Sequence, residues 1–383
     1  MKYLILFLRV ALGLLFIYSG LVKANDPMGL VYKMNEIFEA WGMNSLVHYS
    51  FALSVGMIAF EIFGGVAMIV GNAFPTWITF MVLINVFYFF LTWYILVKGT
   101  VKECGCFGAC IKISNQATFN KDVALTAISI FLWIFRFRVF PLFQKSSVNI
   151  GIVGAATVFS FGFQYYTLHH LPYHDCLAYK VGNNLWEKMH AAPGAIDDSF
   201  KTTLIYEMNG NKKEFTLQEF MDQNISENPK WKFVEQKSEL VREGSGQAEI
   251  PHDFQINTLN GDDMTEDLLT KKGNMFFLFM RDGKNVTDKN REEIKALAAK
   301  AKELKVDFYI LSSMGADDVK AYQEAYAMKD VKFMLLDQVV SKTAMRTDPG
   351  LMLLHDGTVV KKWSYLDYPK EIALDGSGAV TFK

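Results

Sequence analysis

Five long apolar stretches are the feature that most limits how this chain folds. They lie within the first 170 residues and cover Tyr3–Gly20, Phe51–Gly71, Trp77–Val97, Val123–Phe143 and Val148–Thr167. A bilayer core needs about 20 predominantly apolar residues in a helix, because every backbone polar group must find its partner within the segment. The pattern predicts five membrane-spanning helices, the last of which delivers the chain to its remaining residues.

Charge separates the chain into two halves. The 383 residues are 51% hydrophobic and carry a net charge of −1, but residues 1–169 carry +5 and the remainder −6. Length and hydrophobic content exclude a disordered chain. The near-zero charge argues against a protein that holds nucleic acid by bulk electrostatics. We therefore predict that a lipid bilayer surrounds the first half, that the second half is soluble, and that there is no nucleic-acid partner.

The start of the chain resembles a secretory signal, because an apolar run precedes the small-residue segment Val22–Ala24. A retained helix is favoured, since the run is long, contains Arg9 and is followed by further spans. Five spans place the two ends on opposite sides. Arg136 and Arg138, expected in the last turns of span 4, can reach a cytoplasmic interface, although the loop lysines mildly oppose this orientation. We predict a bacterial inner-membrane protein with its C-terminal domain in the periplasm.

Two charged residues lie inside predicted spans, Arg9 in the first and Glu61 in the second. A charge in hydrocarbon costs at least ~2.5 kcal/mol, so it usually faces a partner or a cavity. The sequence predicts an Arg9–Glu61 pair. This pair would fix helix packing or belong to a proton or ligand pathway in a transport-related bundle. Small residues at Gly64–Gly65 and Gly151–Ala155 predict close helix contacts.

All four cysteines face one compartment. Cys104, Cys106 and Cys110 lie between spans 3 and 4, and Cys176 follows span 5. Three chemistries stay open. The first is thiol–disulfide exchange by a Cys104–Cys106 or Cys106–Cys110 pair with Cys176 as partner, and the second is structural disulfides that pin the loop to the base of the soluble part. The third is a zinc or copper site made of the four thiols, or of thiols together with His169, His170, His174 and Asp175. The spacing matches no standard zinc motif, so we assign no metal ligand.

The membrane half resembles a known family over about residues 1–143. The run Arg9–Gly20 followed by Lys23 resembles the opening of DoxX-family proteins, while Glu61 with Gly64–Gly65 and the loop Cys104–Gly108 resemble the DoxX relative MauE. The resemblance implies a four-helix membrane bundle at residues 1–146 with an outward cysteine loop, to which residues 147–172 add a fifth span. MauE-type proteins are associated with periplasmic disulfide formation and DoxX relatives with thiol and sulfur redox. Similar fusions to a soluble tail occur in Bacteroidota.

The soluble tail divides near residue 247. Residues 173–247 contain strand-like runs and predict a small β-rich subdomain. Residues 248–383 alternate strands such as Asn274–Met280 and Val306–Ser312 with amphipathic helices such as Thr287–Leu304. This order, which ends in a hairpin around Asp356-Gly357, predicts an α/β sheet with an antiparallel end.

The second part of the tail resembles the thioredoxin-like group related to peroxiredoxins and TlpA. Phe254–Gly261 resembles their opening strand, and Thr347–Gly350 resembles the position of their cis-proline, so we expect Pro349 to be cis. The redox cysteines of that group would follow Asn274–Met280, but no cysteine occurs after Cys176. Because disulfide exchange needs a thiolate, the domain is predicted to be redox-inactive. The roles left open are docking of a peptide by strand addition at Pro349 and a passive scaffold.

Together these features predict an accessory membrane protein that supports periplasmic thiol redox or assembly of an envelope complex with a periplasmic or membrane protein partner. Any enzymatic activity would be at most that of a thiol–disulfide oxidoreductase acting through the loop cysteines. A quinone is the expected electron sink by analogy with membrane disulfide generators, although no motif demands it. The competing hypotheses are a purely structural or interaction subunit and a small-molecule transport-related bundle.

Overall fold

The structure is a computed structural model. It divides into two compact units, Met1–Trp186 with His252–Lys383, and Glu187–Pro251, and each is described by itself. The residues that the structure describes are 1–98, 108, 110–111, 113–191, 194–195, 199–208, 211–216, 219, 230–242, 248–250, 254–376 and 378–383.

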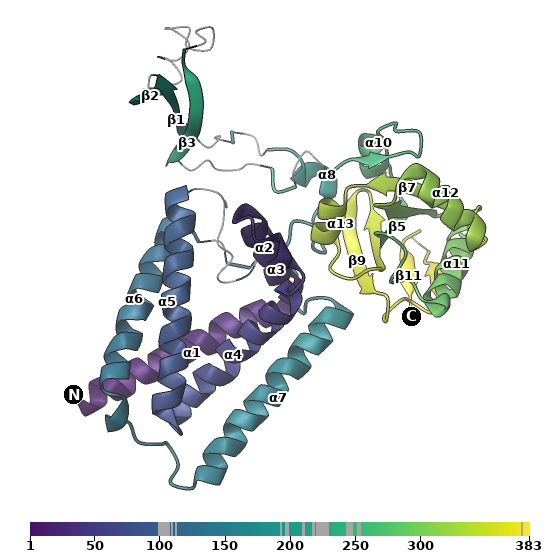
Figure 1. Ribbon diagram of the computed structural model, residues 1–383. Helices are drawn as coiled ribbons and strands as arrows, with labels where there is room; N and C mark the ends of the chain where they lie inside the picture. Colours follow the sequence, from purple (N-terminus) through teal and green to yellow (C-terminus); the bar gives the residue numbers. More distant parts are fainter. Residues whose placement is uncertain are drawn as a thin grey trace. The chain divides into compact units, whose positions relative to one another are not determined.

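Five helices of the first unit are long and apolar enough to cross a membrane (Figure 1). They are α1 (Lys2–Asn25), α4 (Ser50–Val70), α5 (Phe74–Lys98), α6 (Asn115–Ile134) and α7 (Ser146–His170). This finding confirms the predicted membrane bundle of five spans.

Two further helices, α2 (Pro27–Ala40) and α3 (Asn44–Val47), connect α1 to α4, and the sequence reading did not predict them. The Asp26 carboxylate caps α2 by accepting a hydrogen bond from the Gly29 backbone N–H at 3.1 Å. Pro27 occupies the first turn. An acidic cap followed by proline is a helix-start signal, and it was overlooked because α2 is too short and too polar to span a bilayer.

The predicted limits of span 4, Val123–Phe143, are wrong. The helix α6 begins after Ser114, whose hydroxyl accepts a hydrogen bond from the Ala117 backbone N–H at 3.3 Å, and it ends at Ile134. Hydropathy missed the start because the first turns of α6 contain polar residues that face the bundle interior. Arg136 and Arg138 consequently lie in a following 3₁₀ turn and not in the last turns of the span.

Glycines allow α1 and α4 to cross closely. A Cβ atom built on Gly65 would lie 2.6 Å from the Gly13 carbonyl oxygen, and one on Gly13 would lie 2.7 Å from the Gly65 carbonyl oxygen. The predicted close contact at Gly64–Gly65 is confirmed, since only glycine fits such an approach. The one predicted at Gly151 and Gly154 is wrong, because no described residue comes within 4 Å of a Cβ built at either position.

A six-stranded mixed sheet forms the C-terminal part of the first unit, in the order β4-β7-β6-β5-β8-β9. β5, β6 and β7 run parallel to one another. β8 is antiparallel to β5, and β9 is antiparallel to β8. The strands are β4 (Ile256–Asn257), β5 (Asn274–Met280), β6 (Asp307–Ser312), β7 (Lys332–Leu336), β8 (Gly350–His355) and β9 (Thr358–Ser364).

The helices α11 (Asp288–Glu303) and α12 (Ala316–Ala325) connect the parallel strands, as such crossovers require. Of the other helices, α10 (Thr265–Leu269) precedes β5 and α13 (Gln338–Ala344) leads from β7 to β8, and a small sheet of β10 (Ile372–Leu374) and β11 (Val380–Phe382) follows β9. α11 buries Ile294, Leu297 and Ala301 in the core formed with β5 and β6. The strand order and directions give the predicted α/β sheet with an antiparallel end.

The second unit holds an antiparallel sheet in the order β2-β1-β3. Its strands are β1 (Ser199–Met208), β2 (Asn211–Thr216) and β3 (Lys232–Arg242), which give the predicted β-rich subdomain. A one-turn helix, α8 (Leu185–Lys188), crosses the boundary between the two units.

Candidate functional site

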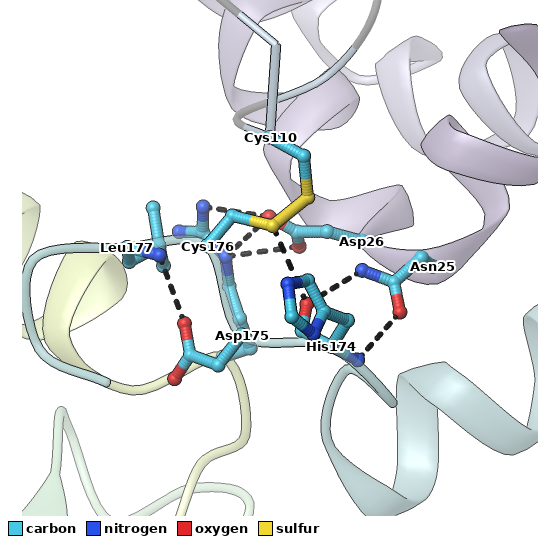
Figure 2. The surroundings of a disulfide bond; sticks show 8 residues. Asn25, Asp26, Cys110, His174, Asp175, Cys176 and Leu177 are labelled. Carbon is cyan, nitrogen blue, oxygen red and sulfur yellow. Dashed lines mark hydrogen bonds and ion pairs between the residues drawn. A yellow bond between two sulfur atoms is a disulfide. The ribbon is translucent and has the colours of Figure 1, made fainter. Parts of the chain in front are cut away.

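A disulfide bond joins Cys110 to Cys176, which are 66 residues apart in the sequence and 4.9 Å apart between their Cα atoms (Figure 2). It links the loop between α5 and α6 to the segment that follows α7. Cys104 and Cys106 lie outside the described residues. The structure therefore brings together two of the four predicted thiols, from the two places that the sequence put in one compartment.

The end of α1 holds the segment that carries Cys176. The Asn25 side-chain amide donates to the His174 carbonyl oxygen at 2.8 Å, and its oxygen accepts from the His174 backbone N–H at 2.9 Å. The Asp175 carboxylate then accepts the Leu177 backbone N–H at 3.0 Å, which tightens the turn around Cys176 (Figure 2). These local hydrogen bonds fix the backbone on either side of Cys176.

Asp26, next to Asn25, is one partner of a buried ion pair. Its carboxylate accepts hydrogen bonds from Arg346 Nε at 2.9 Å and Nη2 at 2.8 Å, and the two side chains are 10% and 9% exposed. A bidentate arginine–carboxylate pair is both strong and geometrically specific. It connects α2 of the bundle to the segment that follows α13.

A second buried contact involves the residue that precedes Cys176. Lys362 Nζ on β9 lies 2.7 Å from Asp175 Oδ2, and the lysine side chain is 7% exposed. Burial lowers the pKa of Lys362, and the neighbouring Asp175 carboxylate acts in the opposite direction. Positive side chains of the α/β domain thus meet the carboxylates beside both Asn25 and Cys176.

Glu61 lies in a buried hydrogen-bond cluster of the bundle. Its Oε1 accepts from Lys23 Nζ at 2.5 Å and from the Tyr88 hydroxyl at 2.7 Å, and its Oε2 accepts from the Ser19 hydroxyl at 3.0 Å. Glu61 is 1% exposed and Lys23 is 5% exposed. The ion pair neutralises both charges within the apolar region, where an isolated charge would be costly.

The predicted Arg9–Glu61 ion pair is therefore wrong. Arg9 Nη1 donates to the Phe140 carbonyl oxygen at 2.9 Å, and its guanidinium packs against Gly71. α1 and α4 run in opposite directions, so Arg9 meets the end of α4, ten residues past Glu61. At a rise of about 1.5 Å per residue, this is about 15 Å along the helix.

The loop before β8 packs against the segment that follows β5. The Asp348–Pro349 peptide bond is cis, which confirms the prediction for Pro349. The Asp348 carboxylate accepts hydrogen bonds from the Arg281 backbone N–H at 3.0 Å and the Asn285 amide at 3.1 Å. Polar residues thus occupy the segment in which the resemblance placed the redox cysteines.

Sequence reasoning missed the partners that complete these sites. Lys23 falls just beyond the apolar window, and Tyr88 is one aromatic among many in α5. Asp26 carried the overlooked helix-start signal, whereas no local signal marks Arg346, because its partner lies 320 residues away.

The fold and these sites define a membrane protein with a helical bundle, a disulfide between the loop after α5 and the segment after α7, and an α/β domain that follows the last spanning helix. The family model of the methylamine utilisation protein MauE matches residues 1–135. A domain of unknown function, DUF8463, matches residues 200–243. No curated protein matches the chain.

Several solved structures are similar to part of the chain. A thiol-disulfide oxidoreductase from Bacteroides fragilis is 14% identical, with 28% of this chain and 85% of that chain covered and a TM-score of 0.25. A thiol:disulfide interchange protein from Bacteroides sp. is 19% identical, with 28% and 75% covered and a TM-score of 0.24. Reduced Prx3 from Vibrio vulnificus is 14% identical, with 32% and 87% covered and a TM-score of 0.26. These similarities concern the fold alone.

Proposed function

We propose that this protein supports thiol–disulfide chemistry at a bacterial inner membrane through the cysteines of its MauE-like bundle. The observation that carries the proposal is the Cys110–Cys176 disulfide, which links the loop after α5 to the segment after α7; in the sequence, Cys104 and Cys106 precede Cys110 by six and four residues. Cys104 and Cys106 are close to Cys110 in the sequence, so they are suited to exchange with its disulfide, because exchange requires a thiolate within reach of the bond that it attacks.

The proposed reaction oxidises a client protein. Two client thiols lose two electrons and two protons and form a disulfide, while a disulfide of the bundle accepts both electrons and both protons and becomes two thiols. A quinone of the bilayer then takes the two electrons and two protons, which restores the bundle disulfide and yields a quinol. Cys104 and Cys106 exchange with the client, and Cys110 and Cys176 form the second pair of the relay.

The thioredoxin-like domain acts in this proposal as a redox-inactive docking module. It has no cysteine, and its Arg281–Asn285 segment hydrogen-bonds Asp348 beside the cis-proline. The backbone beside Pro349 is the edge proposed to receive an extended segment of a membrane or periplasmic partner.

The proposal places the cysteines and the C-terminal domain in the periplasm. A disulfide persists in an oxidising compartment and is rare in a reducing one. After reduction of intact cells, a membrane-impermeant maleimide is expected to label Cys176. Labelling only after the cells are permeabilised would contradict this orientation.

Trapping thiols in cells by acid quench and alkylation tests the redox function. We expect wild type to show both oxidised and reduced forms and mixed disulfides with a second protein. The Cys104→Ser/Cys106→Ser variant is expected to lose the mixed disulfides while Cys110–Cys176 stays oxidised. Gln116→Ser, at an exposed position shortly after the loop, serves as the control. A fixed, fully oxidised pattern in wild type, with no mixed disulfide, would show that the loop is not redox-active.

A purely structural or interaction subunit is the second candidate. The observation that favours it is the pair of buried contacts, Arg346–Asp26 and Lys362–Asp175, which tie the α/β domain to the residues beside the disulfide. In this case the disulfide has only a fastening role, and the trapping experiment shows one oxidised form. The transport hypothesis has lost the Arg9–Glu61 pair on which it rested.

A further inference from the structure

The turn that follows β9 lies at the end of the last spanning helix. Nδ1 of His170, the last residue of α7, is 2.9 Å from both carboxylate oxygens of Asp367 in this turn. Burial raises the pKa of Tyr365, and Tyr165 of α7 acts in the same direction, so the two phenol groups lie near each other. Two residues of the turn after β9 therefore meet the final turns of a spanning helix.

The length of α7 places these contacts near the surface of the bilayer. The helix has 25 residues, which at about 1.5 Å per residue reach about 37 Å, whereas the hydrocarbon core is about 30 Å thick. Its ends therefore extend into the headgroup regions. Tyr165 and Tyr166 are 66% and 50% exposed on its final turns, and tyrosines are enriched at membrane–water interfaces. The turn after β9 is consequently held at the level of this interface.

The turn is a rigid support for one apolar side chain. The Ser364 hydroxyl donates to Asp367 Oδ2 at 2.8 Å and accepts from the Leu366 backbone N–H at 3.1 Å. The Asp367 backbone N–H donates to the Ser364 carbonyl oxygen at 3.0 Å. Leu366 lies between these fixed points and is 53% exposed. A single exposed leucine is ordinary on a soluble surface, so what distinguishes Leu366 is its place beside the end of a spanning helix.

A second contact directs the same end of the sheet toward the membrane half. Gly350 pairs with Ser364, so the cis-proline loop before β8 and the turn after β9 share one end of the sheet. Arg346, shortly before that loop, holds Asp26 at the start of α2. The α/β domain is thus tied to the membrane half at two separate places on this end, which limits its rotation away from the bilayer.

We propose that residues 364–367 form a membrane-surface contact, in which Leu366 inserts among the lipid headgroups next to α7. The partner of this surface is the lipid bilayer, because the turn adjoins a helix that is itself long and apolar enough to cross it. An apolar side chain is stabilised when it leaves water for the boundary between headgroups and acyl chains. The contact keeps the cis-proline end of the α/β domain close to the membrane surface, and it requires no thiol chemistry.

Depth-dependent fluorescence quenching in phosphatidylcholine nanodiscs tests this contact. The parent is the full-length Cys104→Ser/Cys106→Ser variant, in which Cys110 and Cys176 are paired, so that a cysteine introduced by Leu366→Cys is the thiol that reacts with a nitrobenzoxadiazole label. Labelling of the parent gives the background. The lipids carry a nitroxide either at the headgroup or near the end of an acyl chain. We expect the label at Leu366→Cys to lose most of its emission to the headgroup nitroxide and little to the deep one.

Two matched positions bracket this result. Tyr173→Cys, three residues past α7 and 85% exposed, should be quenched to a similar degree. Lys272→Cys, also at an 85% exposed side chain, should keep its emission. It precedes β5 at the opposite end of the sheet, and the seven residues of this strand, at about 3.3 Å each, separate it from the turn by about 20 Å. All three substituted side chains are exposed, and thermal unfolding checks that the variants are folded.

If Leu366→Cys keeps its emission as Lys272→Cys does, the turn does not touch lipid and the proposal is wrong. A second copy of the chain or another protein seated on Leu366 would give that result, because it would shield the label from the nitroxide. Stronger quenching by the deep nitroxide than by the headgroup nitroxide would also refute a contact at the level of the headgroups. Since the measurement reads position and not redox activity, its outcome is separate from that of the thiol-trapping experiment.

Discussion

Glu61 is an acid surrounded by membrane-spanning helices, and its environment explains how it is accommodated. Three side chains from α1 and α5 donate hydrogen bonds to its two oxygens, and Lys23 also supplies the opposite charge. Losing one partner of a buried pair leaves the other charge uncompensated, which costs about 3–5 kcal/mol in soluble proteins, whereas replacing both with apolar groups costs far less.

We therefore predict strong non-additivity between Lys23 and Glu61. Glu61→Leu and Lys23→Met should each lower the free energy of unfolding by about 3 kcal/mol, and the double variant should lose less than their sum by at least about 1 kcal/mol. A double-variant cycle from denaturant unfolding in detergent measures the coupling. The Arg9→Met/Glu61→Leu cycle is the control and should be additive, because Arg9 and Glu61 do not touch. Additive effects of the Lys23 and Glu61 changes, together with coupling between Arg9 and Glu61, would contradict the structure.

The sequence located the buried charges correctly but not their pairing. Hydropathy identifies Arg9 and Glu61 because each interrupts an apolar run, but it does not fix the register between two antiparallel helices. The glycine crossing at Gly13 and Gly65 sets that register, which brings Lys23 opposite Glu61. Cys110 and Cys176 were placed on one side by counting spans, but choosing that pair among four cysteines required the folded chain.

At the scale of elements, the turn between β8 and β9 is one that the sequence predicts from a single dipeptide, Asp356-Gly357. Asp356 and Gly357 have φ angles of 50° and 75°, the left-handed conformations that suit an Asp-Gly turn. The Asp356 carboxylate also accepts the Gly273 backbone N–H at 2.6 Å. That hydrogen bond lowers the pKa of Asp356, with a further contribution from Lys272.

This lowered pKa predicts a loss of stability in acid. Asp356 holds its proton less tightly in the folded chain than in the unfolded chain, whose value is near 3.8. The stability that it contributes is present above pH 3.8 and is lost as pH falls through the lower folded pKa, since the unfolded chain then binds more protons. Asp356→Asn should flatten the fall of the unfolding temperature below pH 3.8. Asp330→Asn, at an exposed position in the turn before β7, is the control, and an equal effect of both variants would argue against the Gly273 contact.

A helix or strand was predicted accurately where its sequence signal was local. β5 coincides with the apolar run Asn274–Met280, and four of the five spans lie close to their predicted positions. α2 and the start of α6 were missed because their polar residues lower the hydropathy of segments that fold against the rest of the unit. Asp26 meets Arg346, and Thr118 and Asp122 are buried, so the hydropathy of either segment alone did not reveal its structure.

At the scale of the whole first unit, one chain of contacts leads from the α/β domain to the disulfide. Arg346 holds Asp26, the neighbouring Asn25 holds His174, and His174 lies two residues before Cys176. Disulfide stability depends on how closely the folded protein holds the two thiols together. The α/β domain is therefore expected to stabilise the Cys110–Cys176 bond, although Cys110 lies in the loop after α5 and Cys176 in the segment after α7.

We predict that Arg346→Met makes the Cys110–Cys176 bond easier to reduce. Removing the arginine leaves a buried carboxylate at Asp26 and loosens the end of α1 that positions His174. The dithiothreitol concentration for half reduction should fall about tenfold or more, since 1.4 kcal/mol corresponds to tenfold. Alkylation of purified Cys104→Ser/Cys106→Ser protein, which has only this pair of thiols, measures the midpoint.

Lys329→Met is the matched control for this experiment, because it removes one partner of an exposed ion pair with Glu324. Exposed pairs contribute about 0–1 kcal/mol, so its midpoint should stay within a fewfold of the parent. Asp26→Asn should shift in the same direction as Arg346→Met, and the double variant should add little to either, since both changes break one contact. If Arg346→Met leaves the midpoint at the parent value, the disulfide is held by the bundle alone and the α/β domain contributes nothing to its stability.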